Sequence, residues 1–211
     1  MASIENAGPN NGDANFDETL DSKQSYVATL IDSAGNYVTY QIASGNRFNN
    51  MMILQPGSVP ELPVAMASGI VDFTVDSITP GETIEVGILL PDNVKPDGYY
   101  MYGATVDNLS QHWSNFDFDG MTGAIYRGVV AFTNNSTSEV FNKNVLSLYV
   151  EDGGRGDADM TVNGVITVTG AASAMPSSSD GGGLISFWYL LGLIAILSVT
   201  RYFLRECSCN D

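Results

Sequence analysis

The sequence predicts an all-β protein, an antiparallel β-sandwich followed by a flexible stalk and one C-terminal transmembrane helix. Three observations lead to this prediction. Apolar and polar residues alternate in short runs between residues 25 and 170, and turn-forming residues separate those runs. A long uncharged apolar stretch then follows a segment rich in glycine and serine. The 211 residues are enough for one ordinary domain with appendages.

The segment 25–170 is predicted to form the sandwich domain. Within residues 70–76, Val71, Phe73 and Val75 alternate with polar residues, which is typical of a strand with one buried and one solvated face. Strands are predicted at residues 26–31, 37–42, 70–76, 84–90, 99–104, 124–133, 146–150 and 162–168. Several of these runs are separated by Pro, Gly, Asn and Asp. Strands at this spacing predict an immunoglobulin-like antiparallel sandwich.

Residues 1–24 form an acidic leader with a candidate calcium loop. In a calcium loop, oxygens at positions 1, 3, 5, 7, 9 and 12 converge on one hard cation. These positions fall, in order, on Asp13, Asn15, Asp17, the Thr19 carbonyl, Asp21 and Gln24. Glu18 departs from the pattern because it stands where glycine allows the sharp turn, and Gln24 departs because it lacks a bidentate carboxylate. Two interpretations stay open, a weak calcium site or a disordered acidic leader.

A second acidic segment, Glu151-Asp-Gly-Gly-Arg-Gly-Asp-Ala-Asp159, offers the carboxylates of Asp152, Asp157 and Asp159 around three glycines. Glycines permit positive φ, so these carboxylates could cap a turn or hold a cation. The sequence favours the structural turn and keeps the cation site as the alternative.

The sequence predicts that the protein is not an enzyme. Its one histidine, His112, lies beside Trp113, a setting more typical of packing than of base catalysis. The nucleophile elbow, the phosphate-binding loop and the histidine metal motifs are all lacking. Both cysteines, Cys207 and Cys209, follow the apolar stretch, which excludes a disulfide-stapled scaffold and a Cys/His zinc site in the domain.

The net charge of −16 comes from the part of the chain before Leu184, which carries 22 acidic and 6 basic residues. Such a surface repels the phosphate backbone, so nucleic acid is excluded as a partner.

The C-terminal part is predicted to cross a membrane. Residues 171–183 are small, polar and glycine-rich, and they predict a flexible stalk that ends in Gly181, Gly182 and Gly183. Residues 184–200 carry no charge and would span ~26 Å as a helix, which snorkelling of Arg201 extends to residues 184–204. A buried core helix is the alternative.

The flanks of this stretch predict its orientation. Arg201 and Arg205 place the tail, residues 205–211, in the cytoplasm and the acidic domain outside it, because basic residues flank the inner side of a span. The first eleven residues do not form a signal peptide. We therefore expect the chain to be a piece of a longer exported protein, with insertion by the tail alone as the alternative.

Several segments together resemble one bacterial family, the choice-of-anchor U domain. The matching segments are Gly12-Asp-Ala-Asn-Phe-Asp17 with Asp21, Thr79-Pro-Gly-Glu-Thr-Ile-Glu-Val86, Tyr100-Met-Tyr-Gly103, His112-Trp113, Asp152-Gly-Gly-Arg-Gly-Asp-Ala-Asp159 and Asn163-Gly-Val-Ile166. The resemblance covers about residues 8–170. It departs at the end, where Thr167-Val-Thr-Gly170 replaces the usual Asp-Pro-Gly-Gly.

The resemblance implies a domain at the C-terminal end of surface proteins, followed by an interchangeable sorting signal. Ser179-Asp-Gly-Gly-Gly183, the apolar stretch and the arginines are similar to the GlyGly-CTERM signal. Signals of that type are cut by a rhombosortase-type membrane protease in bacteria that use type II secretion. Glu206 and Asp211 dilute the basic flank, so a permanent anchor is the alternative.

These features predict a non-catalytic display and anchoring module of a bacterial cell-surface protein. The alternative is a calcium-assisted adhesion module, or one that binds a glycan or a protein partner through the sandwich loops. Aromatic side chains at the surface would favour the alternative, and the candidates are Tyr99, Tyr100, Tyr102 and Trp113.

Overall fold

The computed structural model describes residues 2–62, 64–134 and 137–174. The predicted transmembrane helix at 184–204, the tail at 205–211 and the glycines at 181–183 lie outside these residues. Among the residues that are described, no helix is long and apolar enough to cross a membrane.

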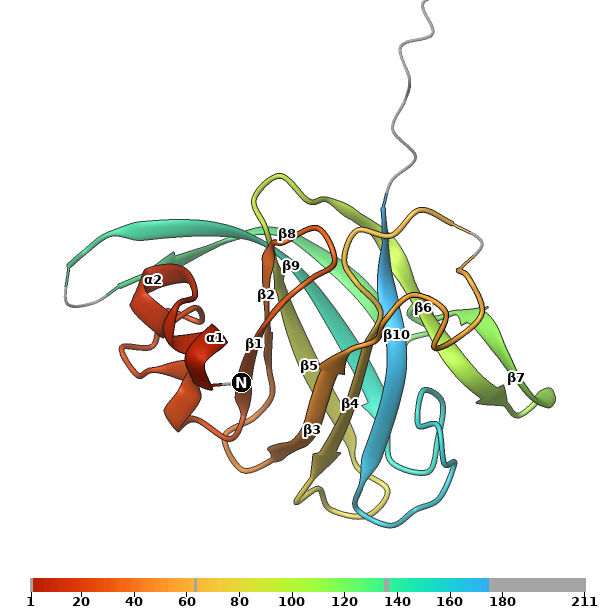
Figure 1. The fold of residues 1–211 in the computed structure, drawn as a ribbon. Coiled ribbons are helices and arrows are strands. Elements are labelled where there is room, and N and C mark those ends of the chain that lie inside the picture. Colours follow the sequence, from red (N-terminus) through yellow and green to blue (C-terminus); the bar gives the residue numbers. More distant parts are fainter. Residues whose placement is uncertain (1, 63, 135–136, 175–211) are drawn as a thin grey trace, which may run out of the picture. The chain divides into compact units, whose positions relative to one another are not determined.

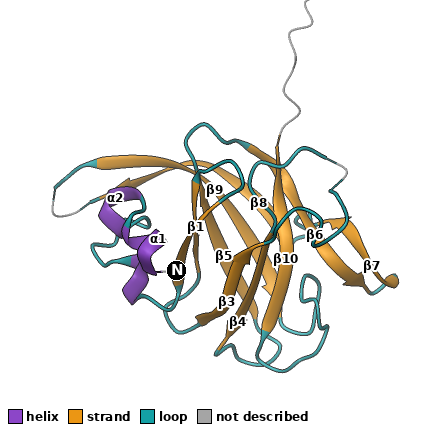
Figure 2. Ribbon diagram, in the orientation of Figure 1, coloured by secondary structure: helices purple, strands orange, loops and turns teal. Residues whose placement is uncertain are grey.

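Ten strands form the body of the molecule, and Figure 2 shows how they dominate it. They are β1 (Val27–Ile31), β2 (Tyr37–Gln41), β3 (Arg47–Ile53), β4 (Val71–Asp76), β5 (Thr83–Leu90), β6 (Pro96–Thr105), β7 (Asn108–Asn115), β8 (Gly123–Thr133), β9 (Val140–Glu151) and β10 (Ile166–Ala174). They pair in two five-stranded sheets, in the orders β1-β2-β5-β9-β8 and β3-β4-β10-β6-β7 (Figure 1). Neighbouring strands run antiparallel throughout both sheets. The prediction of an antiparallel all-β fold is confirmed.

Both sheets contribute to one hydrophobic core, as in a β-sandwich. Val71, Phe73 and Val75 of β4 are fully buried, as their alternation predicts, and so is Val86 of β5 in the other sheet. The ring of Tyr40 on β2 lies 6.0 Å from the ring of Phe73 and joins the two sheets. Each such apolar side chain stabilises the fold by about 1.5–3 kcal/mol.

The sequence does not predict β3 and β7, which are the two edge strands of the second sheet. Their side chains are mostly exposed or half-buried and do not alternate between a buried and a solvated face. An edge strand held largely by backbone pairing leaves little hydrophobic pattern in the sequence.

The last strand begins and ends later than predicted, because β10 runs to Ala174 and so takes in the first four residues of the predicted stalk. Ala171, Ala172 and Ser173 are buried. The segment before β4 bonds to this end of β10, with N–H groups of Ala67 and Ala174 donating to Ala172 and Ala65, both at 2.8 Å. Small side chains here allow the close approach of that segment, so the folded domain does not end at residue 170.

The acidic leader is folded and lies beside β1 (Figure 1). It contains α1 (Ala2–Asn6), α2 (Pro9–Gly12) and a single 3₁₀ turn, η1 (Asp21–Lys23), and both α1 and η1 contact β1. Phe16, in the loop after α2, is buried and stacks on Phe141 at 4.2 Å between ring centroids, with Phe132 at 5.7 Å. The leader therefore joins the edge strand β1 to the β8–β9 hairpin.

Candidate functional site

Asp13 organises the leader loop, residues 13–24. Its Oδ1 accepts a hydrogen bond from the Asp17 N–H, and its Oδ2 accepts one from the Glu18 N–H, each at 3.0 Å. The Asn10 side chain donates to Oδ2 at 2.9 Å. The side chain is buried, so these donors replace the water that a carboxylate needs. Asp13 thus bends residues 13–18, which include Asn15 and Asp17, into a tight turn.

Glu18 takes the backbone conformation that a calcium loop needs at its sixth position. Its φ is +71°, in the left-handed region that normally favours glycine. A side chain in this region costs roughly 1–2 kcal/mol, and the bond from its N–H to Asp13 helps to hold it there. The residue that departs from the sequence pattern therefore does not prevent the turn.

Oxygen-bearing groups gather around the carboxylate of Asp17. The Nε2 of Gln24 donates to Asp17 Oδ1 at 2.8 Å and to the Thr19 carbonyl at 2.9 Å. The Nδ2 of Asn15 donates to the other carboxylate oxygen of Asp17 at 3.1 Å. The remaining side-chain oxygens, Asn15 Oδ1 and Gln24 Oε1, are buried and accept no hydrogen bond from the described residues. Both amides thus meet at Asp17 with an unused acceptor each.

Asp21 ties the loop to the sheet. Its carboxylate accepts the Thr29 hydroxyl of β1 at 2.5 Å and the Ala14 N–H at 3.1 Å, and the side chain is fully buried. Burial raises the pKa of Asp21 to about 6, although the bonds from Thr29 and Ala14 lower it. Of the six predicted ligands, the structure brings Asp13, Asn15, Asp17, Thr19 and Gln24 together and commits Asp21 to β1.

In the second acidic segment, Asp152 is surrounded by backbone donors. Its carboxylate accepts N–H groups of Gly81 at 2.8 Å and Gly164 at 3.0 Å, with Val165 and Asn163 at 3.2 and 3.4 Å. Desolvation raises its pKa, but these four donors, Gly81 and Gly164 foremost, hold the pKa of Asp152 below its ordinary value. Asp152 therefore fastens the β4–β5 loop to the β9–β10 loop.

Asp157 and Asp159 cap the same turn. The carboxylate of Asp157 accepts N–H groups of Gly153 at 2.9 Å and Thr167 at 3.0 Å. Burial raises the pKa of Asp157. Asp159 accepts the Thr161 N–H at 2.8 Å. Each of the carboxylates predicted here has backbone donors of its own, so the geometry fits the structural turn that the sequence favours.

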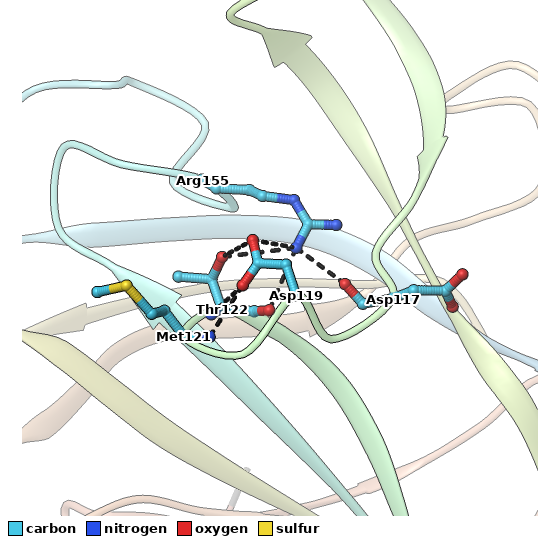
Figure 3. Close-up of polar contacts among 5 residues, drawn as sticks. All are labelled: Asp117, Asp119, Met121, Thr122 and Arg155. Carbon is cyan, nitrogen blue, oxygen red and sulfur yellow. Dashed lines mark hydrogen bonds and ion pairs between the residues drawn. The ribbon is translucent and has the colours of Figure 1, made fainter.

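Sequence reasoning missed the contact of Arg155 with the turn after β7 (Figure 3). Its Nη1 donates to the Asp117 carbonyl at 2.9 Å and the Thr122 carbonyl at 3.2 Å, and lies 3.3 Å from Asp119 Oδ2. Asp119 also accepts the N–H groups of Thr122 and Met121, and these bonds lower its pKa to about 2. The signal that the sequence offers is an arginine within an acidic segment.

A cavity of about 450 Å³ lies between the β6–β7 hairpin and the acidic turn. Its lining includes Met101, Gly103, His112, Phe116, Arg155 and Met160. Among the described residues, the His112 ring is hydrogen-bonded through Nδ1 to the Ser110 carbonyl at 2.8 Å, and not to a carboxylate or a hydroxyl. The geometry of a general base oriented by an acid is therefore not found at this histidine.

The aromatic side chains that could have formed a binding face are largely used for packing. Tyr99 is fully buried in the core. Tyr102 and Trp113 pair at 5.3 Å between ring centroids, and the indole N–H of Trp113 donates to the Pro60 carbonyl at 2.7 Å. Tyr100, Tyr102 and Trp113 are half-buried. Of the four aromatic candidates, the structure therefore buries Tyr99 and leaves the other three partly accessible.

Within the ranges that the structure describes, no three His, Cys, Asp or Glu side chains gather as a metal cluster. Comparison with family models, with curated proteins and with solved structures gives no match for this chain.

Proposed function

We propose that this protein is a non-catalytic display and anchoring module of an exported bacterial cell-surface protein. The observation that supports this proposal best is the position of β10, the strand through which the chain leaves the fold. β10 is the central strand of its sheet, with β4 and β6 as neighbours. A tether that begins at a central strand pulls on the middle of the sheet, and not on an edge that can peel away.

The pairing of β10 makes this exit strong. Residues 166–170 pair with β4, and residues 170–174 pair with β6. On the side that β4 leaves free, Ser173 forms an isolated bridge with Met66. Hydrogen bonds therefore hold the strand on both sides up to its end at Ala174. A force along the strand loads these bonds together, whereas a force across a strand would break them one after another.

The other parts of the proposal come from the sequence and the described carboxylates. The domain, an immunoglobulin-like sandwich, stands outside the cytoplasm. Residues 184–204 form the transmembrane helix, flanked by Arg201 and Arg205. A rhombosortase-type protease acts near Gly181, Gly182 and Gly183, in a host with type II secretion. The absence of catalysis is supported by Asp152 and Asp157, whose carboxylates are engaged by backbone donors.

The test is the topology of the chain in a bacterial inner membrane. The full chain is exported behind a cleavable signal and carries an epitope after Asp211. We expect it to fractionate with membranes, and protease added to spheroplasts should digest the domain and leave the epitope protected. In the variant Leu190→Arg with Leu193→Arg, each charge opposes insertion by about 2.5–3.5 kcal/mol, so the chain should become soluble in the periplasm.

The matched control replaces the same two leucines by isoleucine, which keeps the stretch apolar, and this variant should stay in the membrane. A soluble full-length parent would disprove the anchor. Digestion of the epitope with a protected domain would disprove the orientation.

A further inference from the structure

We propose that the leader loop binds one calcium ion through the side chains of Asn15, Asp17 and Gln24 and the carbonyl of Thr19, and that the ion fixes the leader to the sandwich. This site is independent of the anchoring function. It rests on two separate observations, the convergence of oxygens on one carboxylate and the two buried oxygens that lack a donor.

The first observation is the position of the groups around Asp17. The Nε2 of Gln24 lies 2.8 Å from Asp17 Oδ1 and 2.9 Å from the Thr19 oxygen, so two oxygens from different residues face the same point. On the other side of the carboxylate lies the amide of Asn15. In the described structure, the amide hydrogens of Gln24 and Asn15 face these oxygens. These hydrogens carry a partial positive charge, and a cation in the same place would carry a full one.

The second observation is the pair of unsatisfied acceptors. Gln24 is 7% exposed, and its Oε1 accepts no hydrogen bond from the described residues. Asn15 as a whole is half-buried, but its Oδ1 atom is also buried and accepts no hydrogen bond from the described residues. A buried acceptor without a partner costs about 1–3 kcal/mol, so such an atom calls for an explanation. Each of these oxygens belongs to an amide that already touches Asp17, and rotation of the two amides turns both oxygens toward a cation there.

The chemistry of the donor set points to calcium. Carboxylate, amide and carbonyl oxygens are the ligands of hard cations, and calcium accepts 6–8 oxygens in a flexible geometry, with water filling the open positions. Magnesium demands a near-ideal octahedron, which a loop of mixed amides and carbonyls does not provide. With one carboxylate directly beside the ion, the affinity should be that of an extracellular module, with a Kd on the order of 0.1–1 mM.

The surroundings make a cation favourable in this loop. Four carboxylates and one lysine lie within residues 13–24. Of the described residues, those that form ion pairs, such as Arg155 with Asp119, all lie elsewhere in the fold. Asp13 acts as a positioning residue, because its bonds to the N–H groups of Asp17 and Glu18 set the turn that presents Asp17.

Binding has a structural consequence through Phe16, which lies in the same loop and stacks on Phe141 at 4.2 Å. An ion that fixes the loop also fixes Phe16 against the β8–β9 hairpin. Calcium therefore controls how firmly the leader is held between that hairpin and β1.

In the experiment, a chelator first removes divalent ions from the full chain in detergent micelles. Calcium is then titrated into this sample, and calorimetry measures the heat of binding. We expect a saturable heat in the parent and none in Asp17→Asn. Gln24→Glu supplies the bidentate carboxylate that the last loop position favours, and it should bind calcium about tenfold more tightly. If Gln24 had only a structural role, its replacement by glutamate would not increase the affinity for calcium.

The matched control is Asp107→Asn, which removes one exposed carboxylate from the turn between β6 and β7 and should bind like the parent. As a second readout, calcium should slow amide hydrogen exchange in residues 13–24 of the parent and not in Asp17→Asn. A parent without saturable heat overturns the proposal, even if Gln24→Glu binds. Equal binding by the parent and Asp17→Asn overturns it as well.

Discussion

At the scale of single residues, backbone N–H groups satisfy most of the buried carboxylates in this fold. The buried Asp152 accepts donors from the β4–β5 and β9–β10 loops, and the buried Asp13 accepts amides of its own turn. The exposed Asp119 accepts the amides of its turn in the same way. A buried carboxylate bonded in this way is stabilising only while it is ionised, because the protonated group is a weaker acceptor. Acid should therefore weaken the contributions of Asp152 and Asp119, whose pKa values are lowered, before it affects the apolar core.

Asp119 gives a direct test of this dependence on pH. Its pKa is lowered to about 2 by the bonds from Thr122 and Met121, with a smaller contribution from Arg155. Its contribution to stability is fully present above the ordinary carboxyl pKa of about 3.9 and is lost as the pH falls toward 2. Asp119→Asn should lower the free energy of unfolding at pH 7, and its difference from the parent should shrink between pH 4 and pH 2.

Urea unfolding at several pH values measures this difference. The control Asp107→Asn removes an exposed carboxylate whose side chain forms no hydrogen bond within the described residues, and it should leave the pH dependence unchanged. A difference between Asp119→Asn and the parent that stays constant from pH 7 to pH 2 would contradict the assignment.

Tyr99 tests the cost of an unsatisfied group in the core. Its side chain is fully buried, and its hydroxyl finds no partner among the described residues. Burial, with a smaller effect of Tyr40, raises the pKa of Tyr99, so the hydroxyl stays protonated. Tyr99→Phe removes a buried polar atom that forms no hydrogen bond with the described residues. The substitution should therefore increase the free energy of unfolding in urea by about 1 kcal/mol.

The control for Tyr99→Phe is Tyr126→Phe. The Tyr126 hydroxyl bonds to the side chain of Asn144, so its removal should destabilise the protein by about 1 kcal/mol. The two variants lose the same atom and should change stability in opposite directions. A destabilised Tyr99→Phe would show that its hydroxyl has a partner in solution.

At the scale of elements, the sequence predicts strands where one face is buried. Val71, Phe73 and Val75 reveal β4 because each faces the core. β7 is hidden because its side chains lack this alternation, and the end of β10 is hidden because alanine and serine also occur in stalks. The local pattern therefore predicts the all-β fold. It does not predict the strands, such as β7, that are held largely by backbone pairing with a neighbouring strand.

The same difference applies to the candidate site. Spacing along the chain predicts Asp13, Asn15, Asp17 and Gln24, because a loop of this size brings its own residues together. It does not predict that Asp21 bonds to Thr29 of β1, or that Arg155 meets Asp119 from 36 residues away. These contacts depend on which loops become neighbours after folding, and local sequence carries no record of that.

The attachment of the leader as an element depends on Phe16. This side chain is 5% exposed and packs on Phe141 and Phe132. Phe16→Ala should weaken this attachment by about 3 kcal/mol, because it removes a buried ring that packs on two other aromatic rings. Amide exchange should become faster in residues 2–24, while the exchange of β4 should change little.

Ile4→Ala serves as the control, because Ile4 in α1 is 37% exposed and its loss should have a much smaller effect. Equal exchange of the leader in the parent and in Phe16→Ala would show that α1 and η1 hold it without the aromatic contact.

At the scale of the whole molecule, the two ends of the described chain enter the fold differently. The leader packs beside β1, at the edge of one sheet, and the chain leaves through β10, at the centre of the other. In the proposed anchoring function, a load from the tether therefore reaches the central strand of the second sheet, while the leader can be released without opening that sheet. This arrangement suits a domain that is held at its C-terminal end and remains folded whether or not the tether is cut.

The glycines between the fold and the apolar stretch predict where the tether is cut. Gly181, Gly182 and Gly183 precede the apolar stretch, separated from β10 by residues 175–180. Each glycine lowers helix stability by about 1 kcal/mol relative to alanine. The chain should therefore be open at the three glycines, just before the predicted helix, and expose its peptide bonds to a membrane protease there. Replacing the three glycines by leucine should extend the helix by ~4.5 Å and prevent the cut.

We expect the leucine variant to stay in the inner membrane at full length, while the parent appears at the cell surface in a shorter form. The measurement is the mass of the surface-exposed protein in its native host. Because β10 ends at Ala174, a cut near Gly183 leaves the fold complete, so the shortened protein should keep the parent's circular dichroism. A surface form that still contains Trp188 and Arg205 would show that the helix is a permanent anchor, and the glycines would then act only as part of the stalk.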